Sequence, residues 1–338
     1  MILTMIAYPL FRFITYAGKE QKKSYFNSHN KIIARNSSIN HPKHKYKDAL
    51  DQAMNWCKNQ DMKDYYIKSV DGLTLHASYL PARNPVRTVI LCHGYKGSRF
   101  GSVCHMAEFL HEQGCNLLFI DQRCCDESEG NYITFGSKEQ YDILCWIRML
   151  HNTGIADKGI KINGANDTDR GNKLNGANDT DRDNKKLPIY IYGQSMGASS
   201  VLLASGHKLP SEVKGIIADC GFHSMKEQLR DLASGWFHLN RIDFMLLRVD
   251  LLCNYFASFR MKDTETEKAL RKNRLPVLFF HGMEDTYVLP KHSIENYNAC
   301  VAPKELVIVP GARHLCSSYE NPKLYKSKLL EFFTKYDN

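Results

Sequence analysis

The chain has 338 residues and a hydrophobic content of 43%, enough for one large α/β domain with an embedded subdomain or for two ordinary domains. Charged residues of both signs make up 24% of the chain, which argues against global disorder. The net charge of +9 is most simply explained by a lysine-rich soluble surface, although attraction to anionic lipid or to acidic substrates stays open. The 11 cysteines include no C-x-x-C pair and no zinc-binding spacing, which favours a reduced, cytoplasmic setting.

The N-terminal segment allows two interpretations. Residues 2–17 are largely apolar but include Pro9 and Arg12, and the run is too short for a confident membrane span. Lysine and arginine are frequent from there to residue 47, so residues 1–47 could rest on an anionic membrane surface. The alternative is a helix packed on the protein body. We assign residues 1–64 to an N-terminal helical extension.

From residue 65 onward, short apolar runs alternate with helical patterns. Residues 70–80 predict a β-hairpin whose turn is Asp71-Gly72. Helices are predicted over 103–113 and 139–151. Further strands are predicted over residues 88–92, 116–120, 187–192, 213–218, 275–280 and 305–309. Such alternation predicts an α/β fold with a mostly parallel central sheet and helices on both faces.

Two stretches interrupt this alternation. Residues 162–173 recur almost unchanged as 174–185, and the repeated unit is too polar to build a core, so we predict a solvated loop insert over 157–186. Residues 222–272 are helical in pattern, rich in leucine and aromatic residues, and lie between two predicted strands. We predict that they form a helical cap over the carboxyl ends of the strands. The remainder of 65–338 then forms the main domain.

The pentapeptide Gly193-Gln194-Ser195-Met196-Gly197 stands between a predicted strand and an apolar helical run. In a strand–turn–helix context, G-x-S-x-G forms a nucleophile elbow that exposes the serine on a strained turn. The glycines are needed because strand and helix pass close together there. Ser195 is therefore the candidate nucleophile, whereas Ser199 and Ser200 lie inside the helix and are expected to pack.

A serine hydroxyl needs a base to take its proton and an acid to orient that base. After an elbow of this type, the acid and then the histidine follow along the chain, each beyond the end of a strand. Asp285 and His314 satisfy both conditions. Glu284 is the competing acid. His93 and His281 are interpreted as structural.

The negative charge that develops on an attacked acyl oxygen needs two backbone N–H donors. One is expected from Met196, the residue after the nucleophile, and the other from Tyr95 in the loop that follows strand 88–92. An ordinary tight turn is the alternative interpretation of that loop.

Together, these motifs and the segment Asp121-Gln122-Arg123 with Ser128-Glu129-Gly130 resemble the α/β-hydrolase superfamily over roughly residues 65–336. Within it, the chain is similar to the acyl-esterase and serine-aminopeptidase-like branch with a helical cap. This family usually has a glycine where the chain has Asp126, which puts the shape of that loop in doubt.

The resemblance implies a serine hydrolase that cleaves a carboxylic ester through an acyl-enzyme and uses no cofactor or metal. The expected partner is a small-molecule acyl substrate and no nucleic acid. A peptidase, a lipid hydrolase and a non-catalytic binding protein on the same fold stay open as alternatives, because fold does not determine substrate.

Overall fold

The computed structural model describes residues 2–17, 45–155 and 186–337, of which residues 2–5 are described by their backbone alone. Nearly all of the predicted repeat insert, and most of the basic segment that precedes residue 47, therefore lie outside the described residues. The division into domains predicted from the sequence stays a prediction.

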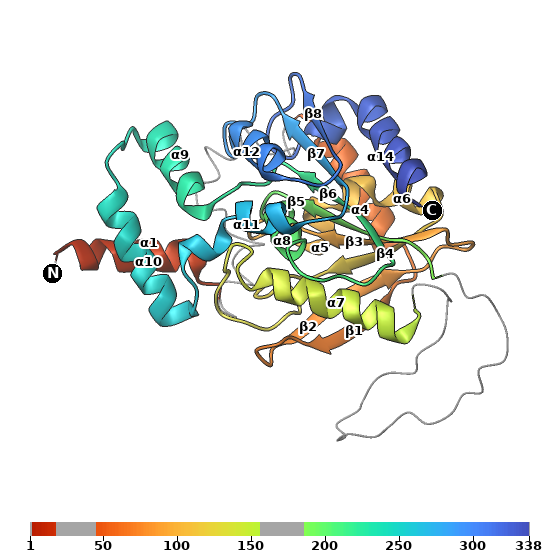
Figure 1. Cartoon of the computed structure of the whole chain (residues 1–338), viewed down its shortest axis with the longest axis horizontal. Coiled ribbons are helices and arrows are strands. Elements are labelled where there is room, and N and C mark those ends of the chain that lie inside the picture. Colours follow the sequence, from red (N-terminus) through yellow and green to blue (C-terminus); the bar gives the residue numbers. More distant parts are fainter. Residues whose placement is uncertain (1, 18–44, 156–185, 338) are drawn as a thin grey trace.

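A single eight-stranded sheet forms the centre of the described structure, in the order β1-β2-β4-β3-β5-β6-β7-β8 (Figure 1). The strands β1 and β2 pair antiparallel, β2 pairs antiparallel with β4, and the others are parallel. Their bounds are β1 Lys63–Lys68, β2 Thr74–Leu80, β3 Arg87–Cys92, β4 Cys115–Ile120, β5 Ile189–Gln194, β6 Val213–Asp219, β7 Val277–Gly282 and β8 Lys304–Val309. The mostly parallel sheet predicted from the alternating apolar runs is confirmed.

Helices cover both faces of this sheet, and each layer follows from an apolar helical stripe. One core cluster includes residues of α4 (Lys47–Lys58), α6 (Ala107–Glu112) and α14 (Pro322–Tyr336). The cluster on the other face includes residues of α7 (Glu139–Thr153), α8 (Met196–Ala204) and α11 (Glu267–Lys272). The short α5 (Arg99–Ser102) and α13 (Ser317–Glu320) and the helix α12 (Lys291–Ala299) complete the layers. Two-sided burial explains why the central strands are apolar throughout rather than alternating.

Several predicted elements differ in their boundaries. Over the range 103–113, where a single helix is expected, the structure has a 3₁₀ turn at Cys104–Met106 followed by α6, and the short α5 precedes them. The strand expected from residue 187 begins at Ile189. Pro188 lacks an N–H group, and only its carbonyl joins the sheet, by accepting the Thr88 N–H at 2.8 Å. The hairpin predicted over 70–80 is present, but its first strand, β1, lies before residue 70. Lys68 stands opposite Thr74, and Gly72 in the turn has a φ of 86°.

Three helices project together from one end of the molecule (Figure 1). These are α1 (Ile2–Thr15), α9 (Met225–Phe237) and α10 (Asp243–Ala257), and the last two lie in the stretch predicted to form a cap. A third apolar cluster joins them to the main body and includes Phe11, Val249 and Met196. The N-terminal helix therefore packs on the protein through one face.

Candidate active site

Ser195 occupies a sharp turn between β5 and α8, with φ 54° and ψ −120°. This is a left-handed backbone conformation that a residue with a side chain adopts at a cost of about 1–3 kcal/mol. The turn persists because its neighbours are fixed: the Ser195 N–H donates to the Asp219 carbonyl at 2.8 Å. Only 4% of Ser195 is exposed.

The two flanking glycines allow this close approach of strand and helix. A Cβ atom placed on Gly197 would overlap the carbonyl oxygens of Cys92 and His93, which belong to backbone that cannot move aside cheaply. A Cβ atom on Gly193 would meet the Gly197 carbonyl. The geometry is therefore that of a nucleophile elbow.

A hydrogen-bonded chain connects Ser195 to His314 and then to Asp285. The Ser195 Oγ lies 3.0 Å from His314 Nε2, and His314 Nδ1 lies 2.6 Å from Asp285 Oδ2. These residues come from three loops at the carboxyl ends of β5, β8 and β7, where parallel sheets of this kind collect functional groups. All three side chains are buried. The arrangement can transfer a proton from the hydroxyl to the imidazole.

The Asp285 carboxylate is held from both sides. Its Oδ1 accepts the backbone N–H groups of Tyr287 and Val288, each at 2.9 Å. Burial by itself raises the pKa of Asp285, but the positive charge of His314 and the hydrogen bonds from His281 and His314 outweigh it. The net pKa therefore falls well below the ordinary range. Glu284, the competing acid, is exposed.

The two histidines interpreted as structural have several partners each, and His281 Nε2 also lies 3.3 Å from Asp285 Oδ2. His281 bonds the Ser293 hydroxyl through Nδ1 at 2.6 Å and the Val288 carbonyl through Nε2 at 2.8 Å. The Nε2 of His93 accepts the Gln122 N–H at 3.1 Å.

The loop predicted to supply an oxyanion donor passes directly over Ser195. A Cβ atom on Gly94 would lie 3.3 Å from the Ser195 Cβ and 3.8 Å from its Oγ. Tyr95 follows Gly94 in this loop, and Met196 begins α8 directly after Ser195. The structure thus brings both predicted donor residues next to Ser195.

A contact that sequence reasoning missed joins this loop to the N-terminal helix. The Tyr95 hydroxyl donates to the Ile14 carbonyl at 2.6 Å, and Lys96 Nζ donates to the Phe13 carbonyl at 2.8 Å. These carbonyls belong to the last turn of α1, where helical carbonyls lack partners within the helix. Burial lowers the pKa of Lys96 to about 8. The helix α1 thus supports the loop through two adjacent side chains.

A second missed residue is Asp219, at the end of β6 beside the elbow. Its Oδ2 accepts the Tyr325 hydroxyl at 3.0 Å, and burial raises its pKa to about 6. The hydrogen bonds of Asp219 are with groups other than His314, whose Nδ1 lies 2.6 Å from Asp285. The position of Asp219 at the end of a predicted strand was a signal that could have found it.

The doubtful loop position, Asp126, adopts a φ of 41°. The chain therefore keeps the backbone conformation that a glycine would favour, with a residue type that tolerates it better than most.

One cluster of side chains could in principle hold a metal ion, although the sequence predicts none. Among the described residues, Cys220, Asp285 and His314 place one ligand atom each within 4.8 Å of one another. Burial raises the pKa of the Cys220 thiol well above its ordinary value, so the sulfur stays protonated, whereas a metal binds the thiolate. The donors of Asp285 and His314 are already bonded to each other. This cluster fits a proton-transfer chain better than a metal centre.

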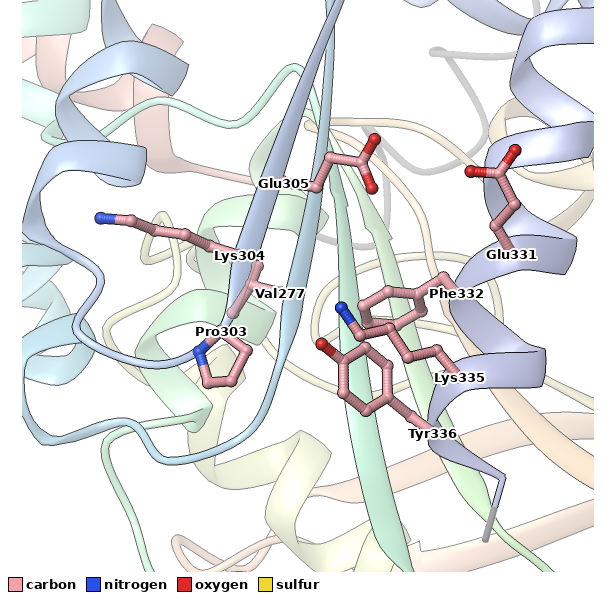
Figure 2. Close-up of a pocket in the computed structure, with 8 residues that line it drawn as sticks. All are labelled: Val277, Pro303, Lys304, Glu305, Glu331, Phe332, Lys335 and Tyr336. Atoms are coloured by element: carbon pink, nitrogen blue, oxygen red, sulfur yellow. The ribbon is translucent and has the colours of Figure 1, made fainter.

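A groove of about 390 Å³ lies away from this site, between β8 and α14 (Figure 2). Val277 and Lys304, which begin β7 and β8, line it together with Phe332 and Tyr336 of the helix. The groove is therefore at the amino ends of these strands, whereas Ser195 lies at the carboxyl end of β5. No residue of the Ser195–His314–Asp285 chain lines it.

Comparison with known proteins agrees with the fold. The prolyl oligopeptidase family matches residues 177–338, a little under half of the chain. The uncharacterized protein YqkD of Bacillus subtilis is 24% identical over 79% of this chain and 78% of its own.

Among solved structures, the Pyrococcus furiosus esterase Pf2001 is 21% identical, with a TM-score of 0.60 over 82% of this chain and 94% of the other. The acylaminoacyl peptidase of Pyrococcus horikoshii is 16% identical, with a TM-score of 0.56 over 84% of this chain and 43% of the other.

The described structure therefore has the α/β-hydrolase fold of these neighbours, and the partial family match supports a hydrolase of this fold. Similar relatives therefore include both an esterase and a peptidase. In the part of the chain that the structure describes, no helix has the length and apolar character needed to cross a membrane.

Proposed function

We propose that this protein is a serine hydrolase that cleaves a carboxylic ester through a covalent acyl-enzyme. The observation that carries the proposal is the continuous chain from Ser195 Oγ through His314 to the buried Asp285 carboxylate. The loop that contains Tyr95 lies beside the nucleophile, as acyl transfer requires.

In the first half of the reaction, Ser195 Oγ attacks the acyl carbon while its proton moves to His314 Nε2. Asp285 holds the imidazole with Nδ1–H toward the carboxylate and stabilises the cation that forms. The backbone N–H groups of Met196 and Tyr95 stabilise the oxyanion. The C–O bond to the leaving alcohol then breaks, and the alcohol takes the proton from His314.

In the second half, water replaces the alcohol. His314 accepts a proton from the water, whose oxygen attacks the acyl carbon of the ester on Ser195. The bond to Ser195 Oγ breaks, and the serine recovers its proton from His314. The products are a carboxylic acid and an alcohol, and no cofactor takes part.

Peptide cleavage is the second candidate, because the matched family is named for an oligopeptidase. The chemistry differs in the leaving group, which would be an amine. A panel of p-nitrophenyl esters of graded acyl length, tested beside aminoacyl anilides, distinguishes the two. Faster turnover of the anilides would favour the peptidase.

Covalent labelling with a fluorophosphonate tests the proposal directly. We expect wild-type protein to be labelled and Ser195→Ala to remain unlabelled while circular dichroism shows a folded chain. Ser199→Ala is the matched control, since that hydroxyl lies one turn into the helix that follows Ser195 and donates to the Phe222 carbonyl at 2.7 Å. Undiminished labelling of Ser195→Ala would assign the nucleophile to another residue.

A further inference from the structure

Helix α10 is apolar on two opposite sides. Its inner side packs into the third core cluster through Leu246, Val249, Cys253 and Ala257. Its outer side carries a second stripe at helical spacing, Phe244, Leu247, Leu251 and Tyr255, which are 49%, 50%, 49% and 80% exposed. A helix that is apolar on both sides is ordinarily buried on both sides. Among the described residues of α10, only those on the inner side are buried in a core cluster.

The N-terminal helix extends this apolar surface. Helices α1 and α10 lie side by side at the projecting end of the molecule (Figure 1). The Tyr8 ring of α1 lies 5.7 Å from the Phe256 ring of α10. Ile6 and Tyr8 are exposed. We call Ile6, Tyr8, Phe244, Leu247, Leu251 and Tyr255 the α1/α10 patch.

The charges around the patch are biased toward cations. The two acidic residues of these helices are both paired, Asp243 with Arg230 and Asp250 with Arg260. Arg12 on α1 and Arg241 just before α10 are exposed. The Arg248 guanidinium lies 4.6 Å from the Phe244 ring. Exposed aromatic and leucine side chains beside arginines are the combination that lies in the interface of an anionic bilayer.

We propose that the α1/α10 patch binds the surface of an anionic phospholipid bilayer and that the ester substrate delivers its acyl chain to Ser195 from that bilayer. The second part rests on the proposed function. The helices that carry the patch pack through their inner sides in the same apolar cluster as Met196, the residue that follows Ser195. The last turn of α1 also contacts Tyr95 and Lys96 of the loop beside Ser195. The bilayer-facing helices are thus directly connected to the site.

Vesicle sedimentation tests the docking without any catalysis. The Ser195→Ala chain is mixed with vesicles of equal parts phosphatidylglycerol and phosphatidylcholine, and we expect it to sediment with them. Adding Leu247→Glu and Leu251→Glu should lower the partition coefficient at least about tenfold, because two half-exposed leucines no longer enter the interface. Pure phosphatidylcholine vesicles or about 1 M salt should also weaken binding.

A matched control uses exposed apolar residues outside the patch. Ile294 and Val301 are 43% and 57% exposed, and glutamates at both positions should leave the partition coefficient within about twofold. The docking proposal is overturned if the parent chain stays in the supernatant or if the control weakens binding equally. A third outcome also overturns it: the parent chain is a dimer, Leu247→Glu/Leu251→Glu makes it a monomer, and neither protein sediments with vesicles. The patch would then be the contact surface for a second copy of the chain.

Turnover tests the substrate route separately. The chain with catalytic Ser195 is given a long-chain ester embedded in the vesicles and a short-chain soluble ester. Leu247→Glu/Leu251→Glu should slow the first reaction at least about tenfold and leave the second nearly unchanged. Equal loss of both reactions overturns the route from the bilayer. Vesicle binding without fluorophosphonate labelling or ester turnover would instead refute the proposed function and leave the docking intact.

Discussion

Replacing Asp285 by asparagine tests the proton-transfer chain with almost no change of shape. The structure determines how the new amide must lie. Asp285 Oδ1 accepts two backbone N–H groups, from Tyr287 and Val288, so the amide oxygen must take that position. The amide NH₂ then points at His314 Nδ1 and donates to it. The imidazole proton is thereby placed on Nε2, facing Ser195, where no proton can be accepted.

The magnitude follows from the cost of the opposite orientation. If the new amide is turned so that its oxygen faces His314, the productive tautomer is restored. The buried N–H groups of Tyr287 and Val288 then face an NH₂ group and lose their acceptor, which costs about 1–3 kcal/mol for each. The total of about 2–6 kcal/mol corresponds to a loss of turnover between about 30-fold and about 10⁴-fold, at 1.36 kcal/mol per factor of ten. The equivalent change in serine proteases lowers turnover about 10⁴-fold.

The assay is kcat for the best p-nitrophenyl ester, with circular dichroism to confirm folding. Glu284→Gln is the matched control, since this neighbouring side chain is exposed and should leave kcat nearly unchanged. Turnover of Asp285→Asn within about threefold of wild type would refute the reasoning, because no tautomer bias of this size could then exist. Loss in Glu284→Gln alone would assign the acid to Glu284.

Three further changes test the surroundings of the site. Tyr95→Phe leaves the Ile14 carbonyl without its donor, at a cost of about 1–3 kcal/mol, so kcat should fall with little change in KM and proteolysis within α1 should accelerate. Unchanged kcat and proteolysis would contradict a supporting role of α1. Gly197→Ala should abolish fluorophosphonate labelling and lower the free energy of unfolding, measured in urea, by more than about 2 kcal/mol. Gly235→Ala is the control: its Cβ would meet nothing within 4 Å, so the free energy of unfolding should rise slightly. Asp219 is buried with a pKa raised to about 6 from 3.8, so the folded state binds the extra proton and loses stability as pH rises through that interval. As pH rises from 4 to 7, the free energy of unfolding of Asp219→Asn should therefore increase relative to that of wild type by up to about 3 kcal/mol. A difference between the two proteins that does not change with pH would contradict a buried Asp219 carboxylate.

Several features of the candidate site could be predicted from the sequence because they depend on local backbone geometry. The elbow around Ser195 needs two glycines between a strand and a helix, and that requirement is visible in five consecutive residues. Asp285 and His314 follow apolar strands, and the carboxyl ends of parallel strands meet at one edge. Pattern and topology together were therefore sufficient to bring these residues near one another.

Other predictions failed at boundaries or left a choice open. The helix expected over 103–113 is replaced by a 3₁₀ turn and the shorter helix α6, because apolar spacing alone does not report where the backbone tightens into a 3₁₀ turn. The sequence favours Asp285 as the acid but leaves the adjacent Glu284 as a competitor. Only the packing of their loop buries one and exposes the other.

The sequence by itself determined the order of strands and helices, the elbow and the candidate nucleophile, since each depends on residues close along the chain. The tertiary structure decided what surrounds them. Tyr95 meets the Ile14 carbonyl across 81 positions, and Asp219 meets Tyr325 across 106. Any helix end offers such carbonyls, so no local pattern indicates which distant side chain will bind them. The outer stripe of α10 likewise looks like core in the sequence, because apolar spacing identifies a face but not what covers it.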